Sequence, residues 1–448
     1  MSHPLAARVS GPVLERDDEG FADEVLAHNR AVVHSPDLVV VATSTQDVVE
    51  AVRWSVRQGQ PLSVLATGHG ARTPVRSGVL VTTHRLRGVS VDPDSRVATI
   101  GAGATWTDVV PVADAVGLAP VAGSSTNVGV VGYLLGGGLG PLARSHGFSS
   151  DRLESLTVVT GDGEVVEASA TEHPDLFWAL RGGRAGLGVV TQLRLRLVEV
   201  PELYAGSLVF DTEHVEAVLR GWLAWTADAD DQTTTSAAII RFPPVEAVPR
   251  PLRGRTAISV RFARPGDEAS GAAAAAPLRA LAPVLLDGIG MLPVAQAERI
   301  HTDPTDPGPS WVRGIMLTGI NADAAPGAAD DLATAVLEHA GPDADSPFVA
   351  VELRHVSGAT GIDVPTGSAV AGRGAAFILG MVGVEPSLFA TAVPAAAQAL
   401  AAAVQPWAFE ELNPNFAGAA TAQWSAAAAD RLGDVRRRYD PTGVFSVA

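Results

Sequence analysis

A strand, a helix and a second strand follow one another within residues 38–65, and this order most constrains the fold of the chain. Residues 38–42 are an unbroken apolar run that suits a buried strand. Ser44 and Asp47 then fit a helix N-cap, and Gly59 ends the helical pattern before a second apolar run at 62–65. The sequence therefore predicts a βαβ unit near the N-terminus.

A histidine between glycines follows the second strand of this unit. It is His69, in the stretch Leu65-Ala66-Thr67-Gly68-His69-Gly70-Ala71. Small neighbours let a backbone approach a bulky ligand closely, and the carboxyl ends of strands are where such folds bind ligands. We therefore predict that His69 contacts a bound ligand. The alternative is a histidine in an ordinary surface turn.

A second unusual stretch is rich in glycine. Residues 123–140 hold seven glycines in eighteen positions, among small hydroxyl side chains. This composition suits neither an ordinary helix nor a pleated strand, and it predicts a backbone lying against a flat or phosphorylated ligand. The dinucleotide fingerprint is not met, because Pro141 follows Gly140 and no sixth-position glycine is present. A flexible linker is the alternative, although the apolar residues between the glycines argue against it.

Composition excludes several kinds of chemistry. All 32 basic residues are arginine and cysteine is absent. Lysine Schiff bases, disulfides, cysteine nucleophiles, thiolate metal sites and thioether links to a cofactor are thereby excluded, and we predict no metal site. A net charge of −17 makes nucleic acid an unsuitable partner. No apolar run reaches the roughly 20 residues of a membrane helix, and no signal-type leader is visible. We expect a soluble, cytoplasmic protein with no membrane partner.

A predicted strand around Glu352 is the most informative part of the second half. Val351 and Leu353 share one face of this strand with further apolar residues. Alternation turns Glu352 and Arg354 to the opposite face, where a charged side chain needs water or a ligand. An exposed ion pair and the roof of a binding site are both open interpretations.

Hydrophobic periodicity predicts the remaining elements. Predicted strands and hairpins lie at 79–100, 154–169, 191–197, 234–242, 257–263 and 377–384. Predicted helices lie at 106–116, 215–223, 268–281, 325–340, 394–404 and 421–439, and a loop at 302–310. Pro201 marks a plausible domain boundary.

Taken in order, the motifs resemble the FAD-linked oxidoreductases of the vanillyl-alcohol oxidase superfamily, specifically the berberine-bridge-enzyme-like branch. The resemblance covers nearly the whole chain. It rests on the entry into the His69 loop (36–69), the glycine segment with Arg144, Gly147-Phe148 and Asp151, the run 175–183, Gly188-Val189-Val190-Thr191, the strand 352–359, Asn415-Phe416 and the C-terminal 431–441.

This resemblance implies an α+β fold in three parts. A two-lobed FAD-binding domain of the PCMH type would occupy residues 1–200. A substrate domain with an antiparallel sheet covered by helices would occupy 201–405. The segment 406–448 would return to the FAD-binding domain.

The resemblance also implies FAD, bonded covalently through His69 to the 8α methyl group of the flavin. Many relatives add a cysteine link at the position of Ser125, so the histidyl bond is the only one expected here. The arginine that often precedes the histidine loop is absent, and Gly70 stands where relatives have serine. Implied cofactor contacts are Ala66, Thr67, Gly68, Gly70, Ser124, Ser125, Thr126, Gly129, Gly132, Gly136, Gly137, Gly138, Gly140, Val190 and Asn415.

Several relatives use a tyrosine as catalytic base, and Phe416 stands at that position here. We therefore predict Glu352 as the base, with Arg354 orienting it or holding a substrate anion. We expect an FAD-dependent oxidase or dehydrogenase, a monomer or homodimer, that takes hydride from a small to medium organic, secondary-metabolite-type substrate. The covalently bound flavin would accept the hydride and would be reoxidised by oxygen. A flavin-dependent monooxygenase of the polyketide-tailoring kind and a flavin-binding protein without catalysis are the alternatives.

Overall fold

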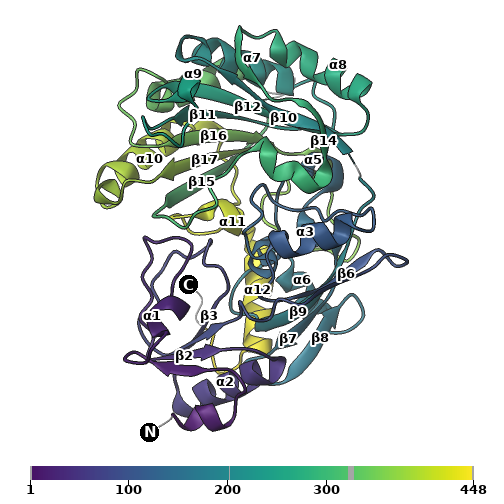
Figure 1. Cartoon of the computed structure of the whole chain (residues 1–448), viewed down its shortest axis with the longest axis vertical. Helices are drawn as coiled ribbons and strands as arrows, with labels where there is room; N and C mark the ends of the chain where they lie inside the picture. Colours follow the sequence, from purple (N-terminus) through teal and green to yellow (C-terminus); the bar gives the residue numbers. More distant parts are fainter. Residues whose placement is uncertain (1–2, 201, 321–326, 446–448) are drawn as a thin grey trace.

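Three β-sheets organise the chain, and the computed structural model describes them in residues 3–200, 202–320 and 327–445 (Figure 1). Two small sheets belong to the N-terminal half, and one large sheet to the second half. Helices cover the large sheet on its outer side in Figure 1. The α+β fold class predicted from the sequence is confirmed.

The first sheet holds the predicted βαβ unit with one difference. The helix α2 (Thr45–Gln58) begins and ends as predicted, since Ser44 accepts a hydrogen bond from the Asp47 N–H at 3.2 Å and Gly59 adopts a left-handed conformation. The strands β2 (Leu38–Val41) and β3 (Leu62–Leu65) are not neighbours. Both pair in parallel with β4 (Val79–Thr82), which is entirely buried between them, and β1 (Val13–Glu15) closes one edge.

The second sheet is antiparallel throughout and packs against helices from distant parts of the chain. Its strands are β5 (Val89–Asp92), β6 (Val97–Gly101), β7 (Leu153–Val159), β8 (Val165–Ser169) and β9 (Val189–Arg196). Its core also includes the helices α3 (Trp106–Asp114), α6 (Pro174–Leu180) and α12 (Ala426–Tyr439). Figure 1 shows α12 in yellow among these blue and teal elements, so the C-terminal helix lies against the first half of the chain.

The third sheet has eight antiparallel strands and one helix-covered face. The strands are β10 (Glu202–Phe210), β11 (Thr234–Arg241), β12 (Thr256–Pro265), β13 (Val284–Asp287), β14 (Gly290–Pro293), β15 (Trp311–Leu317), β16 (Ala350–His355) and β17 (Phe377–Gly383). The covering helices are α7 (Val215–Thr226), α8 (Glu268–Arg279), α9 (Ala328–Ala340) and α10 (Ala392–Ala403). The strands β13, β14 and β15 were not predicted, and Pro201 and the predicted helix start at 325–326 lie outside the described residues.

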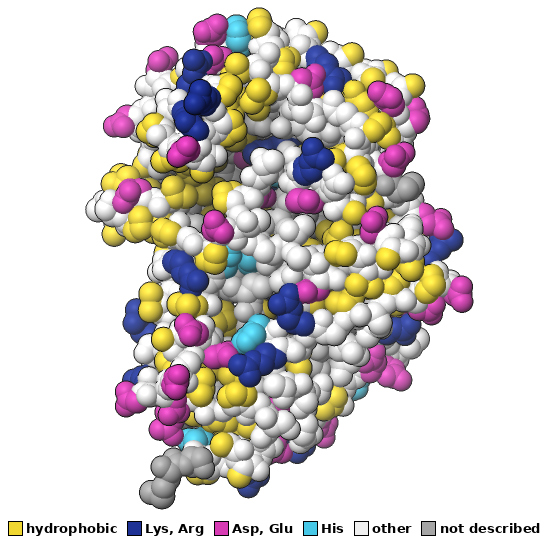
Figure 2. Space-filling model, viewed as in Figure 1, with side chains coloured by type: hydrophobic (Ala, Val, Ile, Leu, Met, Phe, Trp, Pro, Cys, Tyr) yellow, Lys and Arg dark blue, Asp and Glu magenta, His cyan; other side chains and the backbone are white. Residues whose placement is uncertain are grey.

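The surface carries charge of both signs. In Figure 2 arginine side chains occur singly or in small groups among acidic side chains on the visible face. None of the helices in the described part of the chain combines the length and apolarity needed to cross a bilayer.

Candidate active site

His69 lies in the loop after β3 and has a partner on each ring nitrogen. Its Nδ1 lies 2.8 Å from the Thr67 hydroxyl and its Nε2 lies 3.2 Å from Asn127 Oδ1. The imidazole also stacks on His28, with ring centroids 3.6 Å apart. Burial lowers the pKa of His69 to about 4, and the neighbouring His28 adds to this shift. The imidazole is therefore neutral near pH 7 and has one nitrogen lone pair available.

The hydrogen bonds of Asn127 determine which ring nitrogen of His69 carries the proton. Its amide Nδ2 donates to the Thr305 carbonyl at 2.6 Å, and a carbonyl can only accept. Asn127 Oδ1, which also accepts from the Ser125 hydroxyl at 2.7 Å, must then accept from His69 Nε2–H. The lone pair of the neutral imidazole consequently lies on Nδ1, facing the Thr67 hydroxyl.

The glycine-rich stretch contains a short helix, α4 (Val130–Leu135), which the composition did not predict. Several of its glycines are required by contacts inside the protein. A Cβ at Gly136 would lie 1.9 Å from Asn415 Oδ1, one at Gly138 2.4 Å from the Tyr133 ring, and one at Gly140 1.9 Å from the Ala122 carbonyl. These glycines therefore allow neighbouring parts of the protein to pack closely, where a side chain would overlap them.

Other glycines of the stretch leave open space. A Cβ at Gly132 would have no heavy atom within 4 Å, and one at Gly129 would meet only side-chain atoms of the His69 loop, at 3.4 Å or more. Gly137, by contrast, has a positive φ of 102° and packs against Phe148 and Asn413. Gly129 and Gly132 are thus the members of this set whose surroundings remain compatible with a flat ligand.

Glu352 and Arg354 lie on the face of β16 that alternation predicted. Val351 and Leu353 enter the helix-covered core, and the two charged side chains are on the other face. Glu352 Oε2 accepts from Arg354 Nε at 2.8 Å, and Glu352 Oε1 accepts from Arg261 Nη1 at 2.8 Å. Arg261 belongs to β12 and reaches across β11 to this carboxylate. We call Glu352, Arg354, Arg261 and His301 the charged wall.

The side chains of the charged wall are largely buried, and some of their polar atoms are unpaired. The side chains of Glu352, Arg261 and His301 are 16%, 10% and 8% exposed. Among the described residues, Arg261 Nε and His301 Nδ1 are buried without a hydrogen-bond partner. Buried polar groups are rarely left unpaired, so these two atoms indicate that a polar ligand or water binds at this wall.

Burial and the charges of Arg354 and Arg261 determine the protonation states of Glu352 and His301. Burial alone would raise the pKa of Glu352, but Arg354 and Arg261 outweigh it and hold that pKa well below its usual range. Burial, together with the same two guanidiniums, lowers the pKa of His301 to about 3. His301 Nε2 lies 3.8 Å from Glu352 Oε1. The wall therefore presents an ionised carboxylate beside a neutral imidazole.

Two loops join the His69 loop to the charged wall. The segment 124–127 contacts residues 303–305, since Ser124 donates to Asp303 Oδ2 at 2.6 Å and Asn127 donates to Thr305. Asp303 in turn contributes to the field at Arg354. The structure thus brings His69, Ser124 and Ser125 together with Glu352 and Arg354 around one region of the molecule.

The C-terminal segment closes the same region. Asn415 Nδ2 donates to the Tyr133 carbonyl at 2.8 Å, and the Phe416 ring lies 5.7 Å from the Arg354 guanidinium carbon. The positive charge of Arg354 acts electrostatically on the Tyr133 side chain. Phe416 has no proton to exchange, so it can supply shape to this region but no acid–base chemistry.

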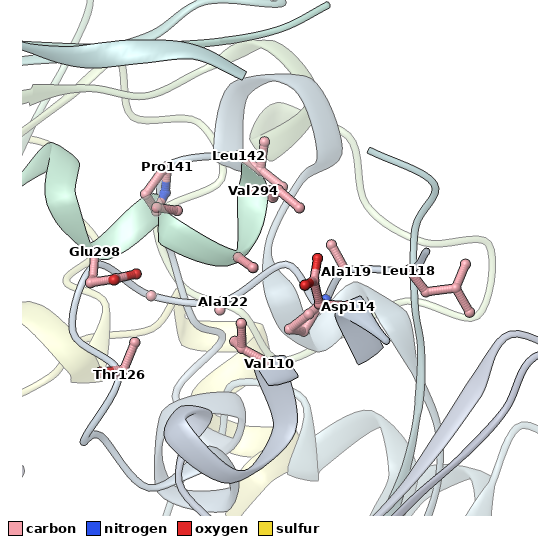
Figure 3. Close-up of a pocket in the computed structure, with 14 residues that line it drawn as sticks. Val110, Asp114, Leu118, Ala119, Ala122, Thr126, Pro141, Leu142, Val294 and Glu298 are labelled. Atoms are coloured by element: carbon pink, nitrogen blue, oxygen red, sulfur yellow. The ribbon is translucent and has the colours of Figure 1, made fainter. Parts of the chain in front are cut away.

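Thr126 and Val190 form no hydrogen bond with His69 or the charged wall among the described residues. Thr126 lines a mostly apolar pocket whose other labelled residues include Val110, Val294 and Glu298 (Figure 3). Val190 is buried in the core of the second sheet, where its backbone pairs with Val158.

The residues around His69 fit FAD. Within the described part of the chain, the backbone N–H groups of 67–70 and 124–127 donate no hydrogen bond, and the positive φ of Gly68, 74°, turns the first of these segments. Successive free amides of this kind suit a diphosphate. The neutral His69 and the open space at Gly129 and Gly132 suit covalent attachment and a flat ring.

Sequence reasoning missed four participants in this region, namely Asn127, Arg261, His301 and Asp303. Arg261 could have been found, because Val260 and Phe262 beside it enter the core and alternation turns Arg261 toward Glu352. His301 and Asp303 belong to a loop, where no periodicity indicates which side chains point inward.

Known proteins resemble this chain in sequence. Residues 36–169 match the family described as FAD binding domain. The (R)-6-hydroxynicotine oxidase of Paenarthrobacter nicotinovorans is 33% identical over 234 residues, covering 51% of this chain and 51% of that oxidase. The chain thus spans about half the length of the curated relatives it matches.

Solved structures share the fold over almost the whole chain. BBE-like 1 of Physcomitrella patens has a TM-score of 0.84 at 19% identity, covering 99% of this chain and 96% of that one. Glucooligosaccharide oxidase from Acremonium strictum, studied for its 6-S-cysteinyl, 8α-N1-histidyl FAD, has a TM-score of 0.81 at 20% identity, covering 99% and 97%. At these identities the likeness establishes the fold.

Proposed function

Because this chain carries the FAD binding domain of the FAD-linked oxidoreductases of the vanillyl-alcohol oxidase family, we propose that it is an FAD-dependent oxidase. Its substrate would be a small to medium organic molecule of the secondary-metabolite type. The observation that carries this proposal is the series of hydrogen bonds from His69 through Asn127 to residues 303–305, which directly follow His301 of the charged wall in the chain. The histidine that holds the cofactor and the buried side chains of the charged wall would then face one bound substrate.

The cofactor would be FAD, attached through His69 alone. The lone pair on His69 Nδ1 supports attachment at that nitrogen, and the chain has no cysteine for a second link. When bound, FAD would supply the hydride acceptor and pass the electrons on to oxygen. Residues 1–200 with 406–448 would hold the cofactor, and 201–405 would supply the charged wall.

Glu352 would accept the proton that leaves the substrate O–H or N–H. Arg261 and Arg354 keep the Glu352 carboxylate ionised, so it is ready at any working pH, but the same charges make it a weak base. A proton transfer to Glu352 Oε would therefore accompany loss of hydride from the neighbouring carbon, when the substrate proton is most acidic. His301, with its unpaired Nδ1, is the second candidate for this role.

The proposal is tested first by the state of the flavin. We expect the purified wild-type protein to stay fluorescent on a denaturing gel and to be heavier by one FAD in intact-mass measurement. Flavin that separates on denaturation would disprove the covalent link, and a protein without flavin would disprove the function.

The reaction type is tested with a substrate that bleaches the flavin without oxygen. For an oxidase we expect full bleaching, hydrogen peroxide after oxygen is admitted, and no label in the product under isotopically labelled oxygen. Incorporation of label would indicate a monooxygenase. Failure of every tested class of alcohol, amine and phenol to bleach the flavin would favour a non-catalytic flavin protein.

A further inference from the structure

Two arginines beside the His69 loop share one acceptor. Arg72 Nη2 and Arg184 Nη1 both donate to the Pro414 carbonyl, the latter at 2.6 Å, and Arg184 Nη2 donates to the Gly70 carbonyl at 3.0 Å. Within the described residues neither guanidinium has a carboxylate at salt-bridge distance. Both side chains are half-buried. A single carbonyl oxygen thus faces two positive charges.

Their surroundings are unfavourable for two cations. Burial lowers the pKa of Arg72 to about 10, with the charge of Arg184 adding to the shift, and burial also lowers the pKa of Arg184. Two partly desolvated guanidiniums repel each other unless an anion lies between or beside them. We therefore expect a negatively charged ligand to bind beside Arg72 and Arg184.

The backbone at Arg184 indicates that its position is specific. Its φ is 61°, in the left-handed region that residues other than glycine seldom adopt. Such conformations persist where the surroundings hold them, and they cluster at ligand sites. The peptide at this position aims the guanidinium at Gly70, whose Cβ, if it had one, would lie 2.7 Å from Arg184 Nη2.

The neighbouring loop identifies the chemistry of the partner. Arg184 contacts the segment 67–70, whose backbone N–H groups donate to nothing among the described residues. Free amides and two guanidinium forks together suit a dianion with many acceptor oxygens, which is a diphosphate. A substrate carboxylate would be expected at the charged wall, and neither arginine contacts that wall.

We propose that Arg72 and Arg184 clamp the diphosphate of FAD. This inference rests on the proposed function, because it assumes that FAD binds at the His69 loop. The arginine that often precedes the histidine loop in relatives is absent here, and the clamp would supply positive charge from the other side of the loop. Arg72 and Arg184 would then decide how tightly FAD, as distinct from its flavin ring, is held.

The test compares ligands with and without phosphate. In a His69→Ala background, in which flavin can exchange, dissociation constants for FAD and riboflavin are measured by fluorescence for the parent and for Arg72→Gln/Arg184→Gln. Each arginine should contribute about tenfold or more to FAD affinity, as charge-assisted hydrogen bonds do. Riboflavin affinity should change by less than about threefold, since the ring and ribityl chain carry no charge.

A matched control removes the same charge elsewhere. Arg57→Gln/Arg250→Gln alters two exposed arginines and should leave FAD affinity unchanged. Arg72→Lys/Arg184→Lys keeps the charge but not the fork, and should lose less affinity than the glutamine pair. Equal losses for FAD and riboflavin, or no loss for FAD, would overturn the clamp. If the wild-type protein carries no flavin, the proposed function fails together with the clamp.

Discussion

The two sides of the candidate site are built in different ways. The His69 side consists of loops, free backbone amides and small residues, and its specific side chains are few. The opposite side is a β-sheet whose charged side chains hold one another in place, as Glu352 does between Arg261 and Arg354. Loops can shape themselves around a large cofactor, whereas strands hold catalytic side chains to a fixed geometry. We therefore propose that the first side binds the cofactor and that the second side supplies the reacting side chains.

The histidines on the two sides are neutral for different reasons. The pKa of His69 falls to about 4 through burial and the neighbouring His28. The pKa of His301 falls to about 3 through burial and the guanidiniums of Arg354 and Arg261. A bound anion would reverse the effect at His301, because it would neutralise those charges. The pKa of His69 would change mainly with how far its ring is buried by a bound group.

The largest expected effect lies on the loop side. His69→Ala should lose all covalent flavin, because no other residue of this loop and no cysteine can form the bond. The readout is flavin fluorescence of the denatured protein. His84→Ala, which removes a partly exposed histidine beside Glu24, should keep the flavin attached. Fluorescence that persists in His69→Ala would assign the link to another residue.

The next effect lies on the wall side. Glu352→Gln should slow anaerobic bleaching of the flavin by about 10²- to 10⁴-fold, the usual contribution of a positioned proton acceptor. Glu213→Gln, at a side chain that is 76% exposed, is the matched control and should change nothing. Bleaching at the wild-type rate in Glu352→Gln, with a large loss in His301→Gln, would transfer the role to His301.

The fold was largely predictable because strong local signals mark it. The Ser44 cap, the stop at Gly59 and the alternation along β9 and β16 each depend on a few adjacent residues. The position of β4 between β2 and β3 was not predictable, because the sequence of an apolar strand does not indicate which strands it pairs with. The helix predicted from 421 begins at Ala426, since Leu412 and Gln423 pair across the preceding turn.

The candidate site was predictable only where a motif or a periodicity exists. The glycine-flanked loop after β3, together with the resemblance, indicated His69, and alternation indicated Glu352 and Arg354. The glycines were harder, because composition does not separate a glycine that makes room for a ligand from one that makes room for protein. Gly136 and Gly140 contact protein atoms, whereas Gly132 faces open space.

This distinction between glycines predicts a moderate difference in stability. Gly136→Ala should lower the free energy of unfolding by about 1–3 kcal/mol, because its Cβ would overlap the Asn415 side chain. Gly132→Ala, in the helix α4, should leave that free energy unchanged or slightly higher, since alanine favours a helix. Urea unfolding of the flavin-free proteins measures both. Equal losses for the two variants would mean that Gly132 also packs against protein.

The smallest expected effect concerns the charge state of His301. A histidine whose pKa is near 6.5 unfolded and about 3 folded stabilises the fold fully above pH 6.5, and this contribution falls as the pH decreases toward 3. Between pH 7 and pH 5 wild type should therefore lose about 1–2 kcal/mol of unfolding free energy more than His301→Gln. Staying at or above pH 5 leaves Glu352 ionised in both proteins.

The comparison of pH dependence cancels the packing change that His301→Gln itself causes, because only the difference between two pH values is read. His84→Gln is the matched control, since that side chain is 42% exposed. If wild type instead gained stability relative to His301→Gln as the pH fell, His301 would be protonated in the fold and paired with Glu352. The wall would then offer an imidazolium, and His301 would act as a proton donor to the substrate rather than as an acceptor.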